Sequence, residues 1–112
     1  MDLFAGMPVS DLERAKQRYS RVLGAEPAFY PDDTEAVWTL EDRRHVYVVV
    51  DGEHAGGGRV TLFVTDLGAW VAAIGERGIE PTTDETYGNG VRKVEYHDPD
   101  GNQFGIGGGP ED

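Results

Sequence analysis

The sequence predicts an α+β fold in which one unit, a strand followed by a helix and further strands, occurs twice. The segment MPVSDLER at residues 7–14 has a close counterpart in LFVTDLGA at 62–69, and GAEP at 24–27 has one in GIEP at 78–81. Within each copy, apolar residues first alternate as in a strand and then recur at helical spacing. Repeated units of this kind complete one core together, so the 112 residues are expected to form a single domain of two modules.

A helix is predicted directly after the first strand of each module. In the first module, Ser10 and Glu13 form a capping-box pattern, and Gly24 marks the end of the helix. In the second, Thr65 is the hydroxyl residue able to cap the helix, and Gly78 marks its end. The two stripes that these helices are expected to bury consist of Leu12, Ala15, Tyr19, Val22 and Leu23 and of Leu67, Trp70, Val71 and Ile74.

Further strands are predicted after each helix. They are AVWTLE at 36–41 and HVYVVVD at 45–51 in the first module, and VRKVEYHD at 91–98 and NQFGIG at 102–107 in the second. The AGGG run at 55–58 is a short flexible connector, which places the modules at 1–54 and 59–112. The glycine-rich GIGGG at 105–109 resembles a phosphate-binding loop only in composition and is interpreted as a loose tail.

Alternation also predicts what each face of the sheets carries. The apolar sets that are expected to pack against the helices are Ala5, Met7 and Val9, Val60, Leu62 and Val64, and Val94 and Tyr96. The opposite face then carries Phe4, Gly6 and Pro8, Arg59, Thr61 and Phe63, and Lys93, Glu95 and His97. One face of the sheets is therefore covered by helices, and the other is free for a ligand or for chemistry.

The charge balance narrows the range of partners. Ten basic and twenty-one acidic residues give a net charge of -11, which repels nucleic acid and anionic membrane surfaces and attracts cationic small molecules. The sequence has no cysteine, so thiolate catalysis and disulfides are excluded. The first residues lack the pattern of a signal peptide, and the apolar run VYVVV at 46–50 is too short to span a bilayer. We therefore expect a cytoplasmic protein.

The repeated VSDLERA-type segment, together with DPDGN at 98–102 before the last strand, resembles the vicinal oxygen chelate superfamily of glyoxalases, bleomycin-resistance proteins and extradiol dioxygenases. The resemblance covers essentially the whole chain. It implies two βαβββ modules whose sheets curl around a central cavity, with the helices on the outer face. It also implies a homodimer, in some members with modules exchanged between chains. Independently of the family, Asp98, Pro99 and Gly101 are typical of a tight turn in which the aspartate binds backbone amides.

The same resemblance identifies the positions that hold a metal ion in the metal-dependent members. Those positions correspond to Phe4, Arg59 and Gly105, and a fourth falls near Val48. None of these side chains is a ligand for a divalent cation, because such a site needs imidazole or carboxylate donors. His45, His54 and His97 are not expected to converge in its place. The sequence therefore predicts no metal and no other cofactor.

A metal-free cavity still suits a small organic molecule, aromatic or cationic in view of the overall charge. The residues expected to bind it are Phe4, Trp38, Val46, Val48, Arg59, Phe63, Lys93, Glu95 and Gln103. Trp38 fits either the core or the cavity wall, because AVWTLE has apolar residues on both faces. Arg59 suits an anionic or carbonyl-bearing ligand or an ion pair with Glu95, and Glu95 suits a cationic ligand or a pair with Lys93 or Arg59.

The favoured function is metal-independent binding of a small molecule, of the bleomycin-resistance type, by a homodimer. One alternative is an enzyme, either a metal-free lyase or isomerase with Glu95 or His97 as general base, or a divergent dioxygenase. Another is an accessory protein whose dimer surface matters more than its cavity. The sequence favours binding over metal-dependent catalysis because the metal positions carry no ligands, and it leaves the identity of the ligand open.

Overall fold

The computed structural model describes residues 1–110, in which seven strands and two helices follow one another. The first module contains β1 (Leu3–Val9), α1 (Leu12–Leu23), β2 (Glu35–Glu41) and β3 (Arg44–Val50). The second contains β4 (Arg59–Val64), α2 (Leu67–Glu76), β5 (Thr83–Thr86), β6 (Arg92–His97) and β7 (Gln103–Gly108). Every helix and strand predicted from the sequence is present. The structure adds β5, whose four residues TDET are all exposed and lack an apolar alternation.

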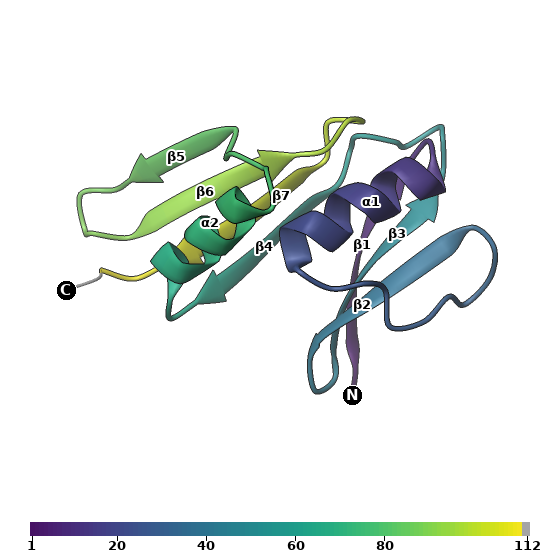
Figure 1. The fold of residues 1–112 in the computed structure, drawn as a ribbon, viewed down its shortest axis with the longest axis horizontal. Coiled ribbons are helices and arrows are strands. Elements are labelled where there is room, and N and C mark those ends of the chain that lie inside the picture. The colour runs from purple at the N-terminus through teal and green to yellow at the C-terminus, as the bar shows by residue number, and fades with distance from the viewer. Residues whose placement is uncertain (111–112) are drawn as a thin grey trace.

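Each module forms its own small sheet, and the α+β class with two repeated modules is confirmed (Figure 1). The strand orders are β1-β3-β2 and β4-β7-β6-β5. In both sheets the first strand runs parallel to the last strand of its module, and the other pairs are antiparallel. The second module is thus a complete βαβββ unit, whereas the first has one strand fewer.

The first module has an isolated antiparallel β-bridge, between Phe29 and Val37, at the place where a fourth strand would lie. It lies on the free edge of β2, in the position that β5 occupies in the other sheet. Pro27 and Pro31 flank this segment. Because proline has no backbone N–H to donate to a ladder, pairing cannot extend far in either direction.

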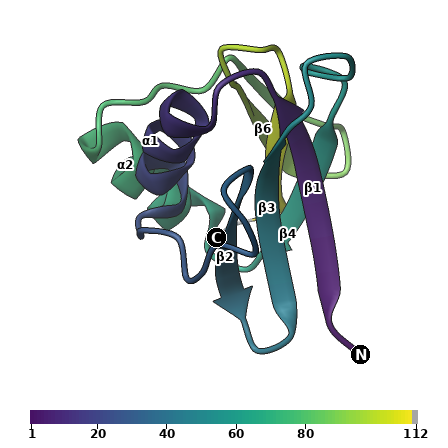
Figure 2. The same ribbon diagram turned by 90° about the vertical axis from the view of Figure 1, so that its right-hand side faces the viewer.

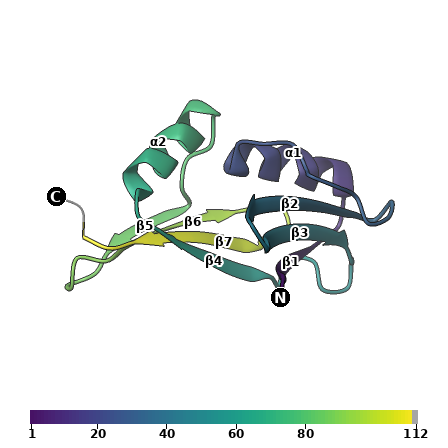
Figure 3. The same cartoon turned by 90° about the horizontal axis from the view of Figure 1, so that it is seen from below.

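Both helices cover the same side of the two sheets, and the other side is left uncovered (Figures 2 and 3). The modules lie side by side, which gives the molecule dimensions of 44 × 28 × 25 Å. We call the side of both sheets that faces away from α1 and α2 the open face. By strand register it carries Phe4, Gly6, His45, Tyr47, Arg59, Thr61, Phe63, Lys93, Glu95, His97, Gln103, Gly105 and Gly107.

The core lies between the sheets and the helices, as the alternation predicts. Its completely or almost completely buried members include Met7, Val9, Tyr19, Ile74, Val94, Tyr96, Phe104 and Ile106. Ala5, Leu62 and Val64 are partly buried and pack against it. None of the described helices combines the length and the apolar character needed to cross a membrane.

The GIGGG segment is not a loose tail, so that interpretation was wrong. Residues 105–108 belong to β7 and are buried. The lack of side chains at Gly105, Gly107 and Gly108 lets neighbours pack directly onto the backbone. A Cβ on Gly105 would lie 2.9 Å from Lys93 Cε, and a Cβ on Gly108 would lie 3.0 Å from the side chain of Leu67. These glycines therefore serve close packing rather than flexibility.

The start of α1 also differs from the capping-box prediction. Asp11, not Ser10, is the N-cap, and its carboxylate accepts a hydrogen bond of 2.8 Å from the Arg14 amide. Ser10 instead donates from its hydroxyl and its amide to the Asp100 carboxylate, at 2.6 and 3.0 Å. This hydroxyl lowers the pKa of Asp100. At the other end, Gly24 adopts the left-handed conformation (φ 76°) and ends the helix as predicted.

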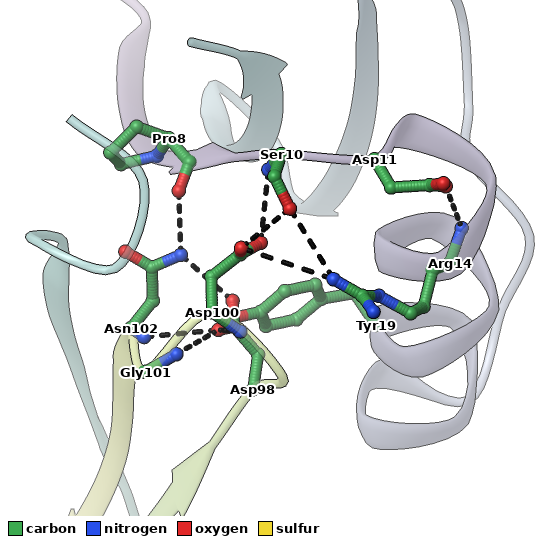
Figure 4. Close-up of polar contacts among 9 residues, drawn as sticks. All are labelled: Pro8, Ser10, Asp11, Arg14, Tyr19, Asp98, Asp100, Gly101 and Asn102. Atoms are coloured by element: carbon green, nitrogen blue, oxygen red, sulfur yellow. Dashed lines mark hydrogen bonds and ion pairs between the residues drawn. The ribbon is translucent and has the colours of Figure 1, made fainter. Parts of the chain in front are cut away.

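The turn at 98–102 joins the two modules through a single buried carboxylate (Figure 4). Asp98 Oδ1 accepts hydrogen bonds of 2.9–3.0 Å from the amides of Asp100, Gly101 and Asn102. Its Oδ2 accepts from the Tyr19 hydroxyl of α1 at 2.7 Å and from Asn102 Nδ2 at 2.8 Å. Burial is the main reason that the pKa of Tyr19 is raised, and the nearby Asp98 adds to it, so this phenol remains a donor.

Asn102 extends the connection to the first strand and the connector. Its Nδ2 donates to the Pro8 carbonyl at 2.7 Å, and its Oδ1 accepts from the Gly58 amide at 2.7 Å. A second link joins the helix ends, where Arg21 and Arg77 each donate to the other's carbonyl oxygen. The modules are thus held together by polar groups at the turn and at the helix ends, in addition to the shared core.

Tyr19→Phe should lower the free energy of unfolding by about 1–3 kcal/mol, because it leaves a buried carboxylate with one donor fewer. Urea denaturation followed by circular dichroism measures this change. Ser20→Ala on the same helix is the matched control, since the Ser20 hydroxyl is buried without a hydrogen-bond partner among the described residues. The control should lose no stability, and equal losses in both variants would contradict the role given to the Tyr19 bond.

Candidate functional site

The open face of the second module carries a polar cluster around Glu95. Lys93 Nζ lies 3.8 Å from Glu95 Oε2, and His97 Nε2 lies 3.8 Å from Glu95 Oε1. Thr83 donates a hydrogen bond of 3.2 Å to Glu95 from the neighbouring β5. The predicted pairing of Glu95 with Lys93 is therefore confirmed, while the carboxylate is shared among three neighbours.

Arg59 does not take part in this cluster. It begins β4 on the same face, opposite Gln103 in register, and its side chain is exposed. Within residues 1–110 its guanidinium makes no ion pair, so the predicted alternative of a pair with Glu95 is not realised. An unpaired guanidinium presents planar donors that suit a carbonyl, carboxylate or phosphate group.

The open face of the first module is aromatic. The Phe4 ring stacks on His45 with centroids 4.3 Å apart, and Phe29 meets the edge of the same imidazole at 6.4 Å. His45 is held at both nitrogens, because Nδ1 contacts Thr39 Oγ1 and Nε2 contacts Asp2 Oδ2, each at 2.9 Å. Phe4 remains 47% exposed, so the stacked pair forms a fixed aromatic surface at the start of β1.

Sequence reasoning missed this second cluster. His45 was expected at the start of a strand, and it lies there. Its contacts with Phe4 and Phe29 were not predicted. The parallel register of β1 and β3 places Phe4 directly beside His45. No pattern within either segment indicated this contact, because Val46 and Val48, rather than His45, were expected to face the ligand.

The structure places six of the nine predicted ligand-binding residues on the open face. They are Phe4, Arg59, Phe63, Lys93, Glu95 and Gln103, and among them Phe63 is the most exposed aromatic residue at 70%. It does not bring them all together, because Phe4 belongs to the first sheet and the other five to the second. A single chain therefore presents two separate patches, one aromatic and one charged.

The remaining three predicted residues lie on the helix side. Trp38, Val46 and Val48 are 2%, 2% and 0% exposed and belong to the core. Their placement follows from register, since Trp38 pairs with Val46 and Ala36 with Val48 in the β2–β3 hairpin. The indole of Trp38 donates to the Ala25 carbonyl at 2.9 Å, which settles its position in favour of the core.

Two hollows accompany these surfaces. A small one of about 70 Å³ lies on the open face between β5 and β6 and is lined by Thr83, Glu85, Tyr87, Lys93 and Glu95. A larger one of about 580 Å³ lies between the two modules, and we call it the wedge cavity; its lining includes His45, Thr61 and Phe63 of the open face. The lining also includes Ala5, Leu23, Glu26, Trp38, Val46, Leu62 and Trp70.

The residues at the family's metal positions do not fit a metal ion. Phe4, Arg59 and Gly105 all lie on the open face, but none offers a donor for a divalent cation, and Val48 faces the core. In the described part of the chain, no three His, Asp or Glu side chains come together as a ligand set. The histidines lie apart, beside different carboxylates: His45 near Asp2, His54 near Asp51 and His97 near Glu95.

Comparison with known proteins places this geometry in a family. The model of the Glyoxalase/Bleomycin resistance protein/Dioxygenase superfamily matches residues 3–106. A glyoxalase/bleomycin resistance protein from Catenulispora acidiphila DSM 44928 has a similar structure, with 51% sequence identity and a TM-score of 0.94 over 98% of this chain and 99% of that one. A search among curated proteins found no match.

Two more distant structures share the fold. The antibiotic-binding protein TnmS3 from Streptomyces sp. CB03234 is 25% identical, with a TM-score of 0.75 over 99% of this chain and 96% of that one. A lactoylglutathione lyase from Agrobacterium tumefaciens is 18% identical, with a TM-score of 0.79 over 97% and 93%. The structural neighbours thus include both a binding protein and an enzyme. With its family model matched along almost its whole length, the chain belongs to the Glyoxalase/Bleomycin resistance protein/Dioxygenase superfamily.

Proposed function

We propose that this protein binds a small organic molecule on its open face, without a metal ion and without transforming the ligand. The observation that carries this proposal is the chemistry of that face. Where metal-dependent members of the family hold their ion, this chain presents a phenyl ring, an unpaired guanidinium and a glycine. Such a surface can stack, donate hydrogen bonds and exclude water, but it cannot activate a ligand as a Lewis acid.

The two patches of the open face suit an aromatic ligand that carries a positive charge. The Phe4–His45 stack offers a rigid aromatic surface, and the cluster on β6 offers the Glu95 carboxylate. Glu95 is mostly buried, so it is less screened by solvent than a surface carboxylate. The net charge of -11 favours the approach of a cation. The antibiotic-binding neighbour TnmS3 lends support to binding rather than catalysis.

We further propose that two copies cover each other's open face. One chain leaves Phe4 and Phe63 47% and 70% exposed on a sheet surface that has no helix over it. Burial of these rings is favourable by about 25 cal/mol per Å² of apolar surface. A two-fold arrangement would bring the aromatic patch of one copy opposite the charged patch of its partner and enclose the ligand between them.

A metal-free enzyme is the second candidate, and one observation favours it. His97 Nε2 is buried without a hydrogen-bond partner among the described residues, and it lies 3.8 Å from Glu95. An imidazole beside a carboxylate on a ligand-binding face is suited to act as a general base. The lactoylglutathione lyase neighbour shares only the fold and does not decide between the two functions.

The binding proposal predicts a ligand that raises thermal stability and is recovered unchanged. A panel of aromatic cations should be screened by melting temperature, with bleomycin added because the family description names it. At a hundredfold excess over Kd, stabilisation of about 2.7 kcal/mol is expected, which shifts the melting temperature by several degrees. Glu95→Gln should weaken a cationic hit, whereas Glu76→Gln on α2 should not. Multiple turnovers of a hit would assign the protein to the enzyme class instead.

The dimer proposal predicts a mass twice the 12.2 kDa of one chain in light scattering at micromolar concentration. Phe63→Glu places a charge in the covered surface and should shift the protein toward the monomer. Tyr30→Glu is the matched control, because Tyr30 is an exposed ring that contacts Lys16 of α1, on the helix side. A monomeric wild-type protein at these concentrations would contradict the proposal.

The metal-independence proposal predicts that the purified protein retains no stoichiometric divalent ion. Elemental analysis after mild dialysis should find well under one equivalent of zinc, manganese, nickel or iron per chain. Added ions at low excess should also leave the melting temperature unchanged, since no ligand set binds them. About one retained equivalent per chain would refute this part of the proposal.

A further inference from the structure

The two sheets end in four outer strands, and three of these edges are protected against pairing with another chain. β5 is four residues long, and all of them are exposed and polar or charged. β2 is covered by the bridge at Phe29. β1 is interrupted by Pro8, whose carbonyl oxygen already accepts from the Gly56 amide and from Asn102 Nδ2. β4 has no such protection, because it contains no proline and its one charged residue, Arg59, is its first.

The backbone of β4 presents hydrogen-bonding groups along this edge. The Gly58 carbonyl accepts from the Gln103 amide at 3.0 Å, which directs every second residue of β4, from Gly58 onward, toward β7. Since N–H and C=O groups alternate between the two sides of a strand, those of Thr61 and Phe63 point toward β1. No backbone hydrogen bond joins β4 to β1 in residues 1–110. Two donors and two acceptors are therefore available to an added chain.

The wedge cavity lies beside this edge. Thr61 and Phe63 line it from the open face, and Leu62, Trp38 and Trp70 line it from the helix side. An added strand would direct its side chains alternately to the two faces of the sheet. The side chain opposite Leu62 would enter the apolar part of the cavity, whose volume of about 580 Å³ leaves room for it. The edge thus favours an extended chain with one apolar side chain at that position.

The start of β4 sets the direction of such a chain. The gap between the modules closes there, because a Cβ on Gly58 would lie 3.1 and 3.2 Å from the Pro8 and Met7 side chains. From this point β1 and β4 diverge (Figure 1). The exposed guanidinium of Arg59 stands at the closed end and makes no ion pair within residues 1–110. A chain that runs antiparallel to β4 ends here with its carboxylate, which suits a guanidinium, whereas a parallel chain would bring its ammonium group.

We propose that the free edge of β4 binds a short peptide by strand addition. The last residue of the peptide lies opposite Thr61, an apolar penultimate residue lies opposite Leu62, and the residue before it lies opposite Phe63. The peptide backbone exchanges hydrogen bonds with Thr61 and Phe63, and its carboxylate pairs with Arg59. This inference goes beyond the proposed function, since it needs neither the aromatic stack nor the carboxylate cluster of the open face, although the edge lies beside Phe63.

The probe is the acetylated tripeptide Ac-Gly-Leu-Gly with a free carboxylate. It has no aromatic ring and no positive charge, so its outcome is distinguishable from that of the aromatic cations screened for the proposed function. Binding to the full-length protein is followed in a ¹H–¹⁵N NMR spectrum at millimolar probe. The backbone amide signals of Thr61 and Phe63 and the indole signals of Trp38 and Trp70 should all move.

Altered probes test each contact separately. Ac-Gly-Gly-Gly has no side chain for the cavity and should bind at least about tenfold more weakly. Amidation of the carboxylate should weaken binding about two- to fivefold, as expected for one exposed ion pair. N-methylation of the last amide removes the donor to Thr61 and should weaken binding roughly two- to tenfold. N-methylation of the leucine amide, which points away from β4, is the matched control and should weaken binding less.

Protein variants locate the peptide on β4. Thr61→Pro removes an edge N–H that makes no bond to β7 and should abolish binding, whereas Thr61→Val keeps this N–H and is the matched control. Arg59→Gln should make the acid and the amidated probe bind equally. Arg43→Gln, in the exposed turn between β2 and β3, should preserve their difference.

Three results would overturn the inference. The first is the absence of any shift at Thr61 and Phe63 with millimolar Ac-Gly-Leu-Gly. The second is equal binding of the two N-methylated probes to the wild-type protein, a comparison that decides even where Thr61→Pro does not fold. The third is edge signals that move with protein concentration alone, which would show that a second copy of the chain pairs with β4.

Discussion

The buried carboxylate of Asp98 is the interaction on which the arrangement of the two modules depends. It is 7% exposed and accepts five hydrogen bonds, three from the amides of its own turn, one from Asn102 and one from Tyr19 of the other module. A buried carboxylate with fewer hydrogen-bond donors would destabilise the fold. The turn must therefore keep its position against α1. No strand of one sheet pairs with a strand of the other. The polar contacts of the turn supply the directional link that a continuous sheet would otherwise provide.

This link has consequences for both surfaces of the molecule. Because the modules are joined at the turn and at the helix ends, both helices cover the same side, and the other side of both sheets stays open. The open face therefore combines an aromatic patch from the first module with a charged patch from the second. The wedge cavity has the same origin, since the modules touch near Gly58 and the helix ends while β1 and β4 diverge elsewhere.

The small residues of β7 show how sequence composition can mislead. Four glycines in five residues suggested a flexible tail, yet Gly105, Gly107 and Gly108 lie buried in a strand. Each is covered by a side chain from a neighbouring element, Lys93, Phe63 and Leu67 respectively. The alkyl chain of Lys93 thus lies where a side chain at position 105 would begin.

The sequence alone determined both helices, six of the seven strands, and the faces of β1, β4 and β6. Those properties depend on periodicity within short segments, and every predicted helix and strand is present, with Ala5, Met7 and Val9 toward the helices. Register and neighbourhood were decided only by the tertiary structure. Trp38 had apolar neighbours on both sides in sequence, and its pairing with Val46 placed it in the core. The contact of Phe4 with His45 and that of Tyr19 with Asp98 join residues far apart in the chain. Such contacts depend on how separate segments pack together. The alternation of residues within one segment does not indicate which other segment lies beside it.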